Sequence, residues 1–363
     1  MLFYIDESVV NSAEDGDTVV LSRLEDLYHC WSKGLCIIGS SRKNFLKISK
    51  IKGLDYYKLV EKTVQGIQPL YESLDFFVVL IHKSKKGQSL NQYKYKIREI
   101  DIESRNGIFD ISLNFLVCEN VLDYDFYKWI TEQYIYEESN FQFHLNLLPF
   151  NGGGDTTLES LKHIQKHFCL VICDSDIKYE GAQEGCTCKN VRSYIDSLYT
   201  YGVKGVWMYT LTVHEVENLI PLDILQRISN KNEVKKLREI LSKGYGETFL
   251  SFFDFKEGFK ESTYRRIKKE NNDVFLKYKE LFLSLGKNEK SLKCILKQNY
   301  RKGQDKCIIQ GVGNSVLANT TRYLMNNYIG KCDYTLSNYQ IYDWNKISRM
   351  VWSLGCAIKP KFI

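Results

Sequence analysis

The sequence predicts an α/β protein with a central parallel sheet flanked by helices. Two observations between residues 111 and 221 predict this fold. Short apolar runs alternate there with amphipathic segments of about 10–15 residues, which is the pattern of parallel strands joined by crossover helices. The runs are also almost continuously apolar, as expected for strands that are buried on both faces. Outside this range the pattern changes, which indicates further domains.

The 363 residues exceed one ordinary hydrophobic core, so two or three domains are expected. Changes in pattern divide the chain into an α+β N-terminal domain of unknown role (1–110), the α/β domain (111–221) and a mostly helical, basic C-terminal domain (222–363). Hydrophobic residues at 44% and charged residues at 26% exclude a disordered or fibrous chain.

The N-terminal region combines short strands with helices. Apolar runs predict strands at 3–5 and 75–81, and alternation predicts a strand with one solvated face at 93–102. Leucines and aromatics recur at helical spacing between Leu21 and Trp31.

Asp6 and Glu7 follow the first N-terminal strand, a position at which several metal nucleases place an acid. No convincing partner acid follows the later strands of this region. We therefore expect a structural or partner-binding role for residues 1–110.

The α/β domain reads as four strands and three helices in alternation. The expected strands are 113–119, 143–150, 168–174 and 203–209, and the helices between them are 121–134, 158–168 and 190–202. Sharp breaks, such as the glycine run after the second strand, separate these elements.

Acidic residues of this domain fall where strands end. Glu119 closes the first strand, Asp123 lies in the first turn of the following helix, and Asp174 and Asp176 close the third strand. In open parallel sheets ligands bind beyond the carboxyl ends of the strands. Crowded carboxylates raise one another's pKa, and a divalent cation such as Mg²⁺ relieves their repulsion. The alternative is that the Asp-Ser-Asp sequence only forms a capped turn.

Three glycines, Gly152, Gly153 and Gly154, follow the second strand. They permit a tight turn whose backbone N–H groups, together with the next helix N-terminus, can approach a nucleic-acid phosphate. A tight strand-to-helix turn without an anion is an equally compatible interpretation.

These motifs together resemble the Toprim domain. The matching features are E-x-x-x-D at Glu119 and Asp123, the glycine turn, and D-x-D-x(4)-G from Asp174 to Gly181. Topoisomerases, bacterial primases, small RNA-maturing nucleases and overcoming-lysogenisation-defect nucleases share this fold. The resemblance covers residues 113–221, and this chain has Asn120 where many Toprim proteins have a glycine.

The resemblance implies further site residues and a metal cofactor. In HEVENLIP (214–221), Glu217 matches the acidic element of Toprim nucleases, with Glu215 as the weaker candidate, and Lys256 is similar to their catalytic lysine. Two Mg²⁺ or Mn²⁺ ions are implied. The implied ligand sets are Glu119, Asp174 and Asp176 for one ion, and Asp123 and Glu217 for the other. The implied catalytic residues are Glu119, Asp174, Asp176 and Lys256.

One segment carries the excess positive charge. Residues 231–306 contain 20 Lys and Arg against 11 Asp and Glu, whereas the whole chain has a net charge of +6. Arg265, Arg266, Lys268 and Lys269 form the densest cluster, here called the basic cluster. Tyr264, Phe275, Tyr278 and Phe282 are interleaved with it. This pattern predicts phosphate contacts and base stacking. The alternative is a solvated helix face whose aromatic side chains point into a core.

The resemblance implies a metal-dependent endonuclease acting on DNA or RNA, including tRNA, as the effector of an anti-phage or toxin-like system. Such effectors pair with a separately encoded ATPase sensor, and this chain has no Walker motif of its own. A homo-oligomer is a further possible partner state. The alternatives are a non-catalytic Toprim-like sensor or binding module, and a primase- or topoisomerase-type enzyme.

Sequence features also predict a cytoplasmic location without membrane partners. No apolar run approaches the roughly 20 residues of a membrane-spanning helix, and the first residues lack a basic segment before an apolar stretch. The 11 scattered cysteines favour buried reduced thiols over a disulfide framework.

Overall fold

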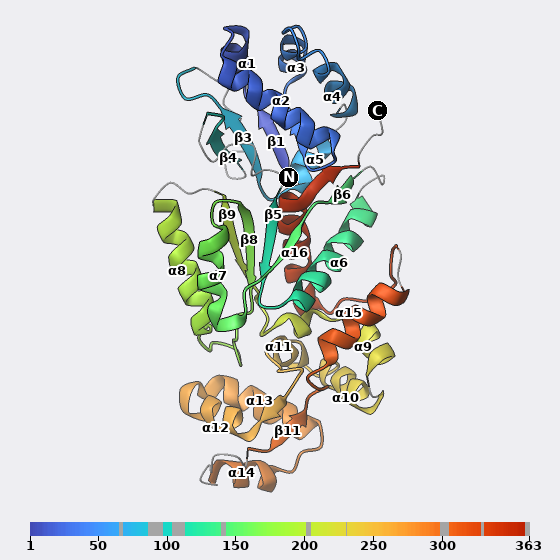
Figure 1. Cartoon of the computed structure of the whole chain (residues 1–363). Helices are drawn as coiled ribbons and strands as arrows, with labels where there is room; N and C mark the ends of the chain where they lie inside the picture. The colour runs from blue at the N-terminus through green and yellow to red at the C-terminus, as the bar shows by residue number, and fades with distance from the viewer. Residues whose placement is uncertain are drawn as a thin grey trace. The chain divides into compact units, whose positions relative to one another are not determined.

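The computed structural model divides the chain into two compact units (Figure 1). It describes residues 1–64, 68–85, 97–103, 113–138, 143–200, 205–229, 231–297, 305–327 and 330–359. The first unit comprises Met1–Val171, Val191–Tyr209 and Lys346–Ile363, and the second comprises Ile172–Asn190 and Thr210–Asn345. Both units are discontinuous in sequence, whereas the three expected domains are contiguous.

The N-terminal region forms a four-stranded parallel sheet in the order β2-β1-β3-β4. The strands are β1 (Leu2–Ile5), β2 (Ile37–Gly39), β3 (Phe77–Ile81) and β4 (Ile97–Asp101). The helices are α1 (Glu7–Glu14), α2 (Thr18–Ser32), α3 (Arg42–Ile48), α4 (Tyr57–Val64) and α5 (Gln68–Ser73). The expected α+β class was therefore wrong for this region. It is α/β, because helices connect β1 to β2 and β2 to β3. The expected strand at 93–102 is β4, and residues 93–96 lie outside the described residues.

Polar side chains begin the helices of this region. The Asp6 carboxylate, directly after β1, accepts hydrogen bonds from the backbone N–H and the hydroxyl of Ser8 at the start of α1. Asp17 accepts from the N–H groups of Val19 and Val20 at the start of α2. Such caps satisfy the first N–H groups of a helix, which have no partner inside it. The capping gives Asp6 a structural role at the start of α1.

The second sheet has the order β7-β5-β8-β9, with β5 parallel to both of its neighbours. Its strands are β5 (Asn114–Cys118), β7 (Leu148–Asn151), β8 (Phe168–Cys173) and β9 (Val206–Thr210). Its helices are α6 (Val121–Glu138), α7 (Thr157–Ile164) and α8 (Cys186–Thr200). Figure 1 shows α6 on one side of this sheet and α7 and α8 on the other. The predicted α/β class with parallel strands and flanking helices is confirmed.

One expected strand is two strands. Residues 143–150 divide into β6 (Phe143–Leu145), which pairs antiparallel with β12 (Cys356–Ile358), and β7, which pairs with β5. The break falls at Asn146, whose backbone N–H donates to the carbonyl of Gly355 and whose side chain donates to that of Leu35. These bonds turn the chain from one sheet to the next.

The C-terminal end of the chain, from Lys346 onward, is part of the first unit. Asp75 accepts hydrogen bonds from Lys346 (2.6 Å) and Arg349 (2.9 Å) of α16 (Asn338–Gly355). Trp352 and Cys356 join the apolar core that covers Phe77 of the N-terminal sheet. The last helix and strand therefore belong to the N-terminal core.

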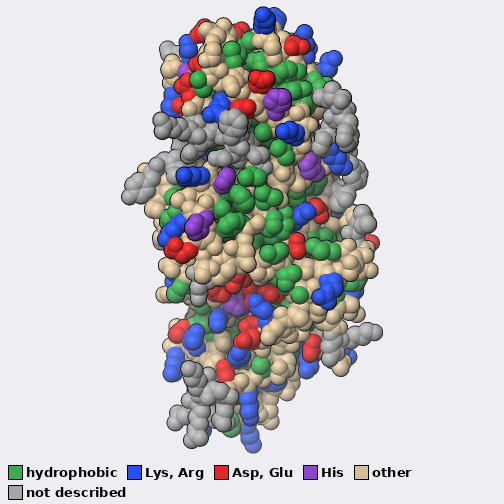
Figure 2. Space-filling view, in the orientation of Figure 1, with side chains coloured by type: hydrophobic (Ala, Val, Ile, Leu, Met, Phe, Trp, Pro, Cys, Tyr) green, Lys and Arg blue, Asp and Glu red, His purple; other side chains and the backbone are tan. Residues whose placement is uncertain are grey.

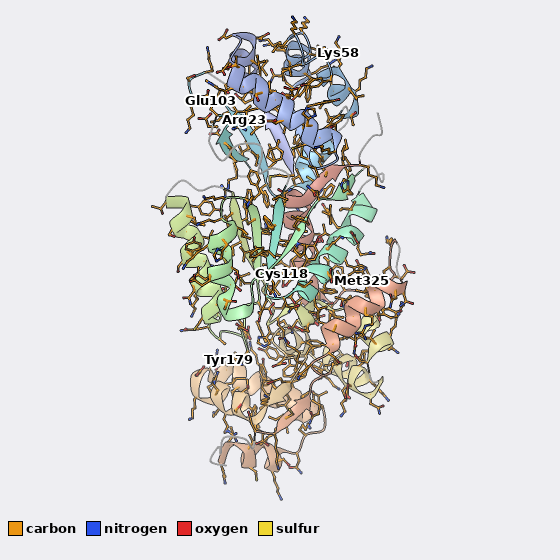
Figure 3. All side chains as sticks on the ribbon, in the orientation of Figure 1. Arg23, Lys58, Glu103, Cys118, Tyr179 and Met325 are labelled. Carbon is orange, nitrogen blue, oxygen red and sulfur yellow. The ribbon has the colours of Figure 1, made fainter. Side chains whose placement is uncertain are left out.

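The second unit is mostly helical, as expected. Its helices are α9 (Leu222–Ile228), α10 (Lys231–Leu241), α11 (Gly246–Ser251), α12 (Glu261–Glu270), α13 (Asn272–Ser284), α14 (Glu289–Lys297), α15 (Val316–Asn327) and the start of α16. A small antiparallel ribbon joins β10 (Gly258–Lys260) to β11 (Cys307–Gln310). Figure 3 labels Tyr179 beside the helices of this unit, where its hydroxyl donates to Glu270 of α12.

The cysteines and the helices of the described residues bear on the expected reduced thiols and on the expected absence of a membrane-spanning segment. The cysteines are free thiols, and seven of them are buried. Among the described residues, no helix is both long enough and apolar enough to cross a membrane.

Candidate functional site

Residues 214–221, after β9, are held by a dense set of hydrogen bonds within the second unit. The Asn218 side chain donates to the carbonyls of Leu250 (2.7 Å) and Phe253 (2.9 Å) and accepts from the N–H of Glu215 (2.9 Å). The side chain of Gln340 donates to the carbonyl of Asn218 (2.8 Å). Both Asn218 and Gln340 are fully buried. Hydrogen bonds to Leu250, Phe253 and Gln340 therefore hold the backbone that carries Glu215 and Glu217.

Glu215 and Glu217 are buried and share one lysine. They are 6% and 3% exposed, and the Lys256 ammonium lies 2.7 Å from Glu215 Oε2 and 3.4 Å from Glu217 Oε1. The other oxygen of each carboxylate, Oε1 of Glu215 and Oε2 of Glu217, is buried without a hydrogen-bond partner among the described residues. Buried polar atoms without partners are rare and call for an explanation, such as an ion that binds there.

Burial and mutual repulsion change the protonation of this group. Burial first, and then the neighbouring Glu217, raise the pKa of Glu215 to about 8. Burial also raises the pKa of Glu217, although Lys256 opposes this. Burial alone would lower the pKa of Lys256, but Glu217 and Glu215 outweigh it and raise that pKa. Burial therefore favours a shared proton on the carboxylate pair, while the two glutamates favour the charged form of Lys256.

Asp174 and Asp176 contact the same segment. Asp174 directly follows β8, and its carboxylate accepts the backbone N–H of Val216 (3.1 Å). Asp176 has φ of +55° and donates its N–H to the carbonyl of His214 (3.0 Å). It is the one non-glycine residue with positive φ in the described chain, and a strained backbone of this kind is often found at functional sites. The Asp-Ser-Asp turn is thus joined to the segment that carries Glu215 and Glu217.

The segment that carries Lys256 leads into β10, and the residues that follow β11 hold it in place. The carbonyl of Phe255 accepts from the N–H of Val312 (2.6 Å), and a Cβ on Gly311 would lie 2.6 Å from the carbonyl oxygen of Lys256. Glycine is required there because the two chain segments approach so closely. Asp254 lies nearby and raises the pKa of both buried glutamates. The sequence singled out Lys256 but not Asp254, although both belong to the same Asp-Phe-Lys sequence.

In the first unit, the glycine turn packs around Glu119, directly after Cys118 at the end of β5 (Figure 3). The N–H of Gly152 donates to the carbonyl of Cys118 (2.6 Å) and that of Gly153 to the carbonyl of Glu119 (2.9 Å). Gly154 has φ of +58°, and a Cβ there would lie 3.2 Å from Glu119 Oε1. The first two glycine N–H groups are thus used inside a tight turn and are not offered to a phosphate.

Asp123 caps a helix. One of its carboxylate oxygens accepts the backbone N–H of Asn120 (2.8 Å), and the Asn120 side chain accepts from the N–H groups of Leu122 and Asp123. This reciprocal arrangement is a capping box at the start of α6. It explains why an asparagine follows Glu119 here.

The predicted metal ligands do not converge in one ligand set. Within the described residues, the one group of three possible ligand atoms within 4.8 Å of one another is Asp17, His82 and Glu103. It contains none of the predicted acids.

The interpretation of the aromatics as base-stacking surfaces was wrong. Tyr264, Phe275, Tyr278 and Phe282 are at most 4% exposed and pack on one another in the core of the second unit. These aromatics lie on the apolar faces of α12 and α13. This agrees with the alternative interpretation, in which they point into a core.

The basic cluster is only partly available to a ligand. Arg265 is mostly buried, donates to the carbonyl of Ile295 (3.0 Å) and lies 3.9 Å from Asp305. Arg266, Lys268 and Lys269 are exposed. In the lower part of Figure 2, Lys and Arg side chains are interspersed with Asp and Glu side chains on the visible face.

No family model, curated protein or solved structure matches this chain. The resemblance to the Toprim domain therefore remains a prediction that rests on short motifs. The function has to be inferred from the chemistry of the site.

Proposed function

We propose that the chain is a divalent-metal-dependent nuclease of the Toprim type. The observation that carries the proposal is the buried Glu215–Glu217 pair, with two carboxylate oxygens unpartnered among the described residues and Lys256 against both side chains. Two buried carboxylates beside one ammonium group are costly for folding, because burial of charge has to be compensated. Such a cost is typical of a catalytic site.

The strand order of the second sheet supports the selection of Glu119 and Asp174 as site residues. In the second sheet the order β7-β5-β8-β9 reverses direction between β5 and β8, and ligands of open α/β sheets bind beyond the strand ends at such a point. Glu119 directly follows β5 and Asp174 directly follows β8. The two residues that the motifs single out are therefore the first residues after the two strands that flank the reversal.

Each residue of the second-unit cluster has a proposed role. Glu215 and Glu217 are the proposed oxygen ligands for Mg²⁺ or Mn²⁺, the hard cations that carboxylates suit best, and Asp174 and Asp176 adjoin them through hydrogen bonds to the segment 214–221. A cation held by these residues would supply activation of the attacking water and stabilisation of the leaving oxygen. Lys256, released from its glutamate partners, stabilises the negative charge that develops on the phosphoryl oxygens. Glu119 and Asp123 stay predicted ligands that mutagenesis has to test.

The substrate we propose is DNA or RNA, bound in part through the exposed members of the basic cluster. Arg266, Lys268 and Lys269 are exposed residues of α12, and the Lys268 ammonium also donates to Asn272 and lies 4.6 Å from the centroid of the Phe275 ring. Phosphate neutralisation by such side chains supplies most of the sequence-independent affinity for nucleic acid. The role as an anti-phage or toxin-like effector, and regulation by a separate ATPase subunit, rest on the resemblance alone.

The test is cleavage of plasmid DNA, total RNA and tRNA by the purified full chain in Mg²⁺ or Mn²⁺. We expect Glu217→Gln, Asp174→Asn and Lys256→Met each to lower the rate at least about 100-fold. Glu239→Gln, an exposed acid on α10, should leave the rate unchanged. Cleavage that needs no metal, or that survives these three substitutions, would refute the proposal. Binding of nucleic acid without any cleavage would favour the non-catalytic alternative.

A further inference from the structure

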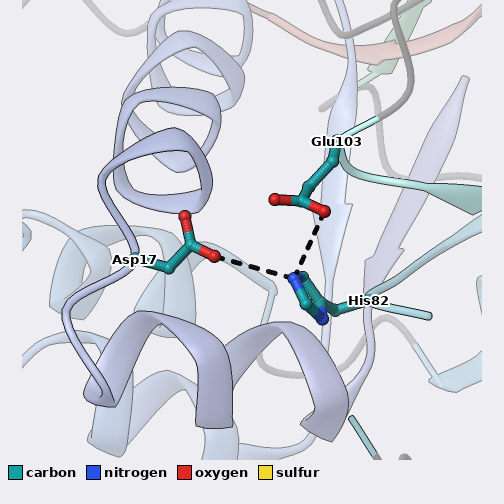
Figure 4. Close-up of side chains that lie close together, drawn as sticks. All are labelled: Asp17, His82 and Glu103. Atoms are coloured by element: carbon teal, nitrogen blue, oxygen red, sulfur yellow. Dashed lines mark ion pairs between the residues drawn. The ribbon is translucent and has the colours of Figure 1, made fainter. Parts of the chain in front are cut away.

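The N-terminal sheet carries a separate cluster of possible metal ligands (Figure 4). Asp17 is the cap of α2, His82 directly follows β3, and Glu103 lies two residues after the end of β4. His82 Nε2 is 3.6 Å from a carboxylate oxygen of Asp17 and 3.6 Å from one of Glu103. Side chains from three different segments thus bring one nitrogen and two oxygen atoms within 4.8 Å of one another.

These separations suit an ion better than direct hydrogen bonds. At 3.6 Å, both contacts are longer than the 2.7–3.2 Å of N–H···O bonds in proteins. A tetrahedral ion with bonds of about 2.0–2.2 Å holds its ligand atoms about 3.3–3.6 Å apart. The nitrogen-to-oxygen distances already have the value that such an ion requires.

The environment of His82 supports the same interpretation. The residue is 6% exposed, and its Nε2 is buried with no hydrogen-bond partner in the described chain. Its other ring nitrogen, Nδ1, lies 2.9 Å from the Ser84 hydroxyl, and its backbone N–H donates to the Ser8 hydroxyl (3.0 Å). When the imidazole proton is on Nδ1, that N–H donates a hydrogen bond to the Ser84 hydroxyl. The lone pair of the unprotonated Nε2 then faces both carboxylates. A metal-binding histidine typically donates its second nitrogen in this way.

The topology places this cluster where a ligand is expected. The order β2-β1-β3-β4 reverses direction between β1 and β3, and His82 is the first residue after β3. This is the general ligand position of open parallel sheets.

We propose that Asp17, His82 and Glu103 bind one divalent first-row transition-metal ion of the Zn²⁺ type. Three protein ligands leave a fourth position of a tetrahedral ion for water or a substrate oxygen. The imidazole ligand discriminates against Mg²⁺ and Ca²⁺, which prefer all-oxygen sites. This site is distinct in residues and in metal preference from the carboxylate cluster of the proposed nuclease centre.

The test is calorimetric titration of Zn²⁺ into the chelator-treated full chain that carries Asp174→Asn and Glu217→Gln, so that the proposed nuclease site is removed. We expect one Zn²⁺ per chain and at least about tenfold weaker binding when Glu103→Gln is added, since one ligand is lost. Glu103 is exposed, so this change should not disturb folding. The matched control is Glu25→Gln, because Glu25 also faces a histidine, His29, at 3.9 Å but on an exposed helix surface.

A second measurement identifies the histidine ligand. Co²⁺ substituted for Zn²⁺ should give visible absorption typical of a four-coordinate site, and His82→Gln should abolish it. Absence of stoichiometric Zn²⁺ binding, or equal affinity with and without Glu103→Gln, would overturn the proposal. If the nuclease site is wrong but this one is right, Zn²⁺ binding persists in the absence of cleavage.

Discussion

Replacing Glu215 by glutamine should change how stability depends on pH. The folded-state pKa of Glu215 is raised from 4.5 to about 8, chiefly by burial, so the folded protein favours the protonated carboxyl. A raised folded-state pKa stabilises the fold fully below the unfolded value. That contribution is lost as the pH rises from about 4.5 through about 8. The glutamine variant mimics the protonated form at every pH and should not lose this stability.

The size of the effect can be bounded from the site. A pKa raised from 4.5 to about 8 corresponds to about 5 kcal/mol at most, at about 1.4 kcal/mol for each tenfold change. Lys256, whose side chain is 35% exposed, offsets part of the cost of ionising Glu215. We therefore expect about 2 kcal/mol, or a shift of about 4–8 °C in the unfolding temperature of a unit of this size.

The assay is thermal unfolding of the metal-free wild type and of Glu215→Gln between pH 5.5 and 9. The wild type should lose stability relative to the variant as the pH rises from 5.5 to about 8, and the variant should be the more stable protein at pH 9. Glu239→Gln, an exposed acid of the second unit, should follow the wild type throughout. A variant that is less stable than the wild type at pH 9 would show that ionised Glu215 stabilises the fold, which contradicts the reasoning.

Three further predictions concern the turn at Glu119 and the basic cluster. Gly154→Ala should destabilise the protein by about 1–2 kcal/mol in urea unfolding, because φ is +58° there, whereas Gly244→Ala, with open space around it, should be neutral. An equal loss of stability in both variants would contradict the role of the positive φ at Gly154. Lys268→Gln with Lys269→Gln should lower the salt slope of nucleic-acid binding by about 1.4–1.8; an unchanged slope excludes these contacts. Arg265→Gln should mainly lower stability, since its guanidinium bonds to the protein, and a selective loss of binding would contradict this.

The parts of the fold that depend on local pattern were predictable from the sequence. Continuous apolar runs located β5 and β8, and the residues that follow them, Glu119 and Asp174, could be selected because parallel strands end at one edge. Lys256 was selected by resemblance, and the structure places it against Glu215 and Glu217.

The parts that depend on distant pairing were not predictable. β6 pairs with β12 more than 200 residues later, and no local pattern at 143–150 specifies that partner. The aromatics interleaved with the basic cluster, such as Phe275, belong to the core because helical spacing places them on the buried face, whereas composition alone cannot separate the two faces. His82 and Glu103 were missed because each is unremarkable alone. A signal was present, however, since both follow strands of the N-terminal sheet closely.

The central claim is that the buried glutamates of residues 214–221 bind a divalent cation. The most direct measurement is calorimetric titration of Mn²⁺ at pH 7 in buffers of different ionisation enthalpy, with Glu103→Gln present to remove the N-terminal cluster. Because the pKa of Glu215 is about 8, binding should release close to one proton per ion. Glu217→Gln should abolish both the binding and the proton release. Absence of Mn²⁺ binding, or binding that Glu217→Gln leaves intact, would contradict the account.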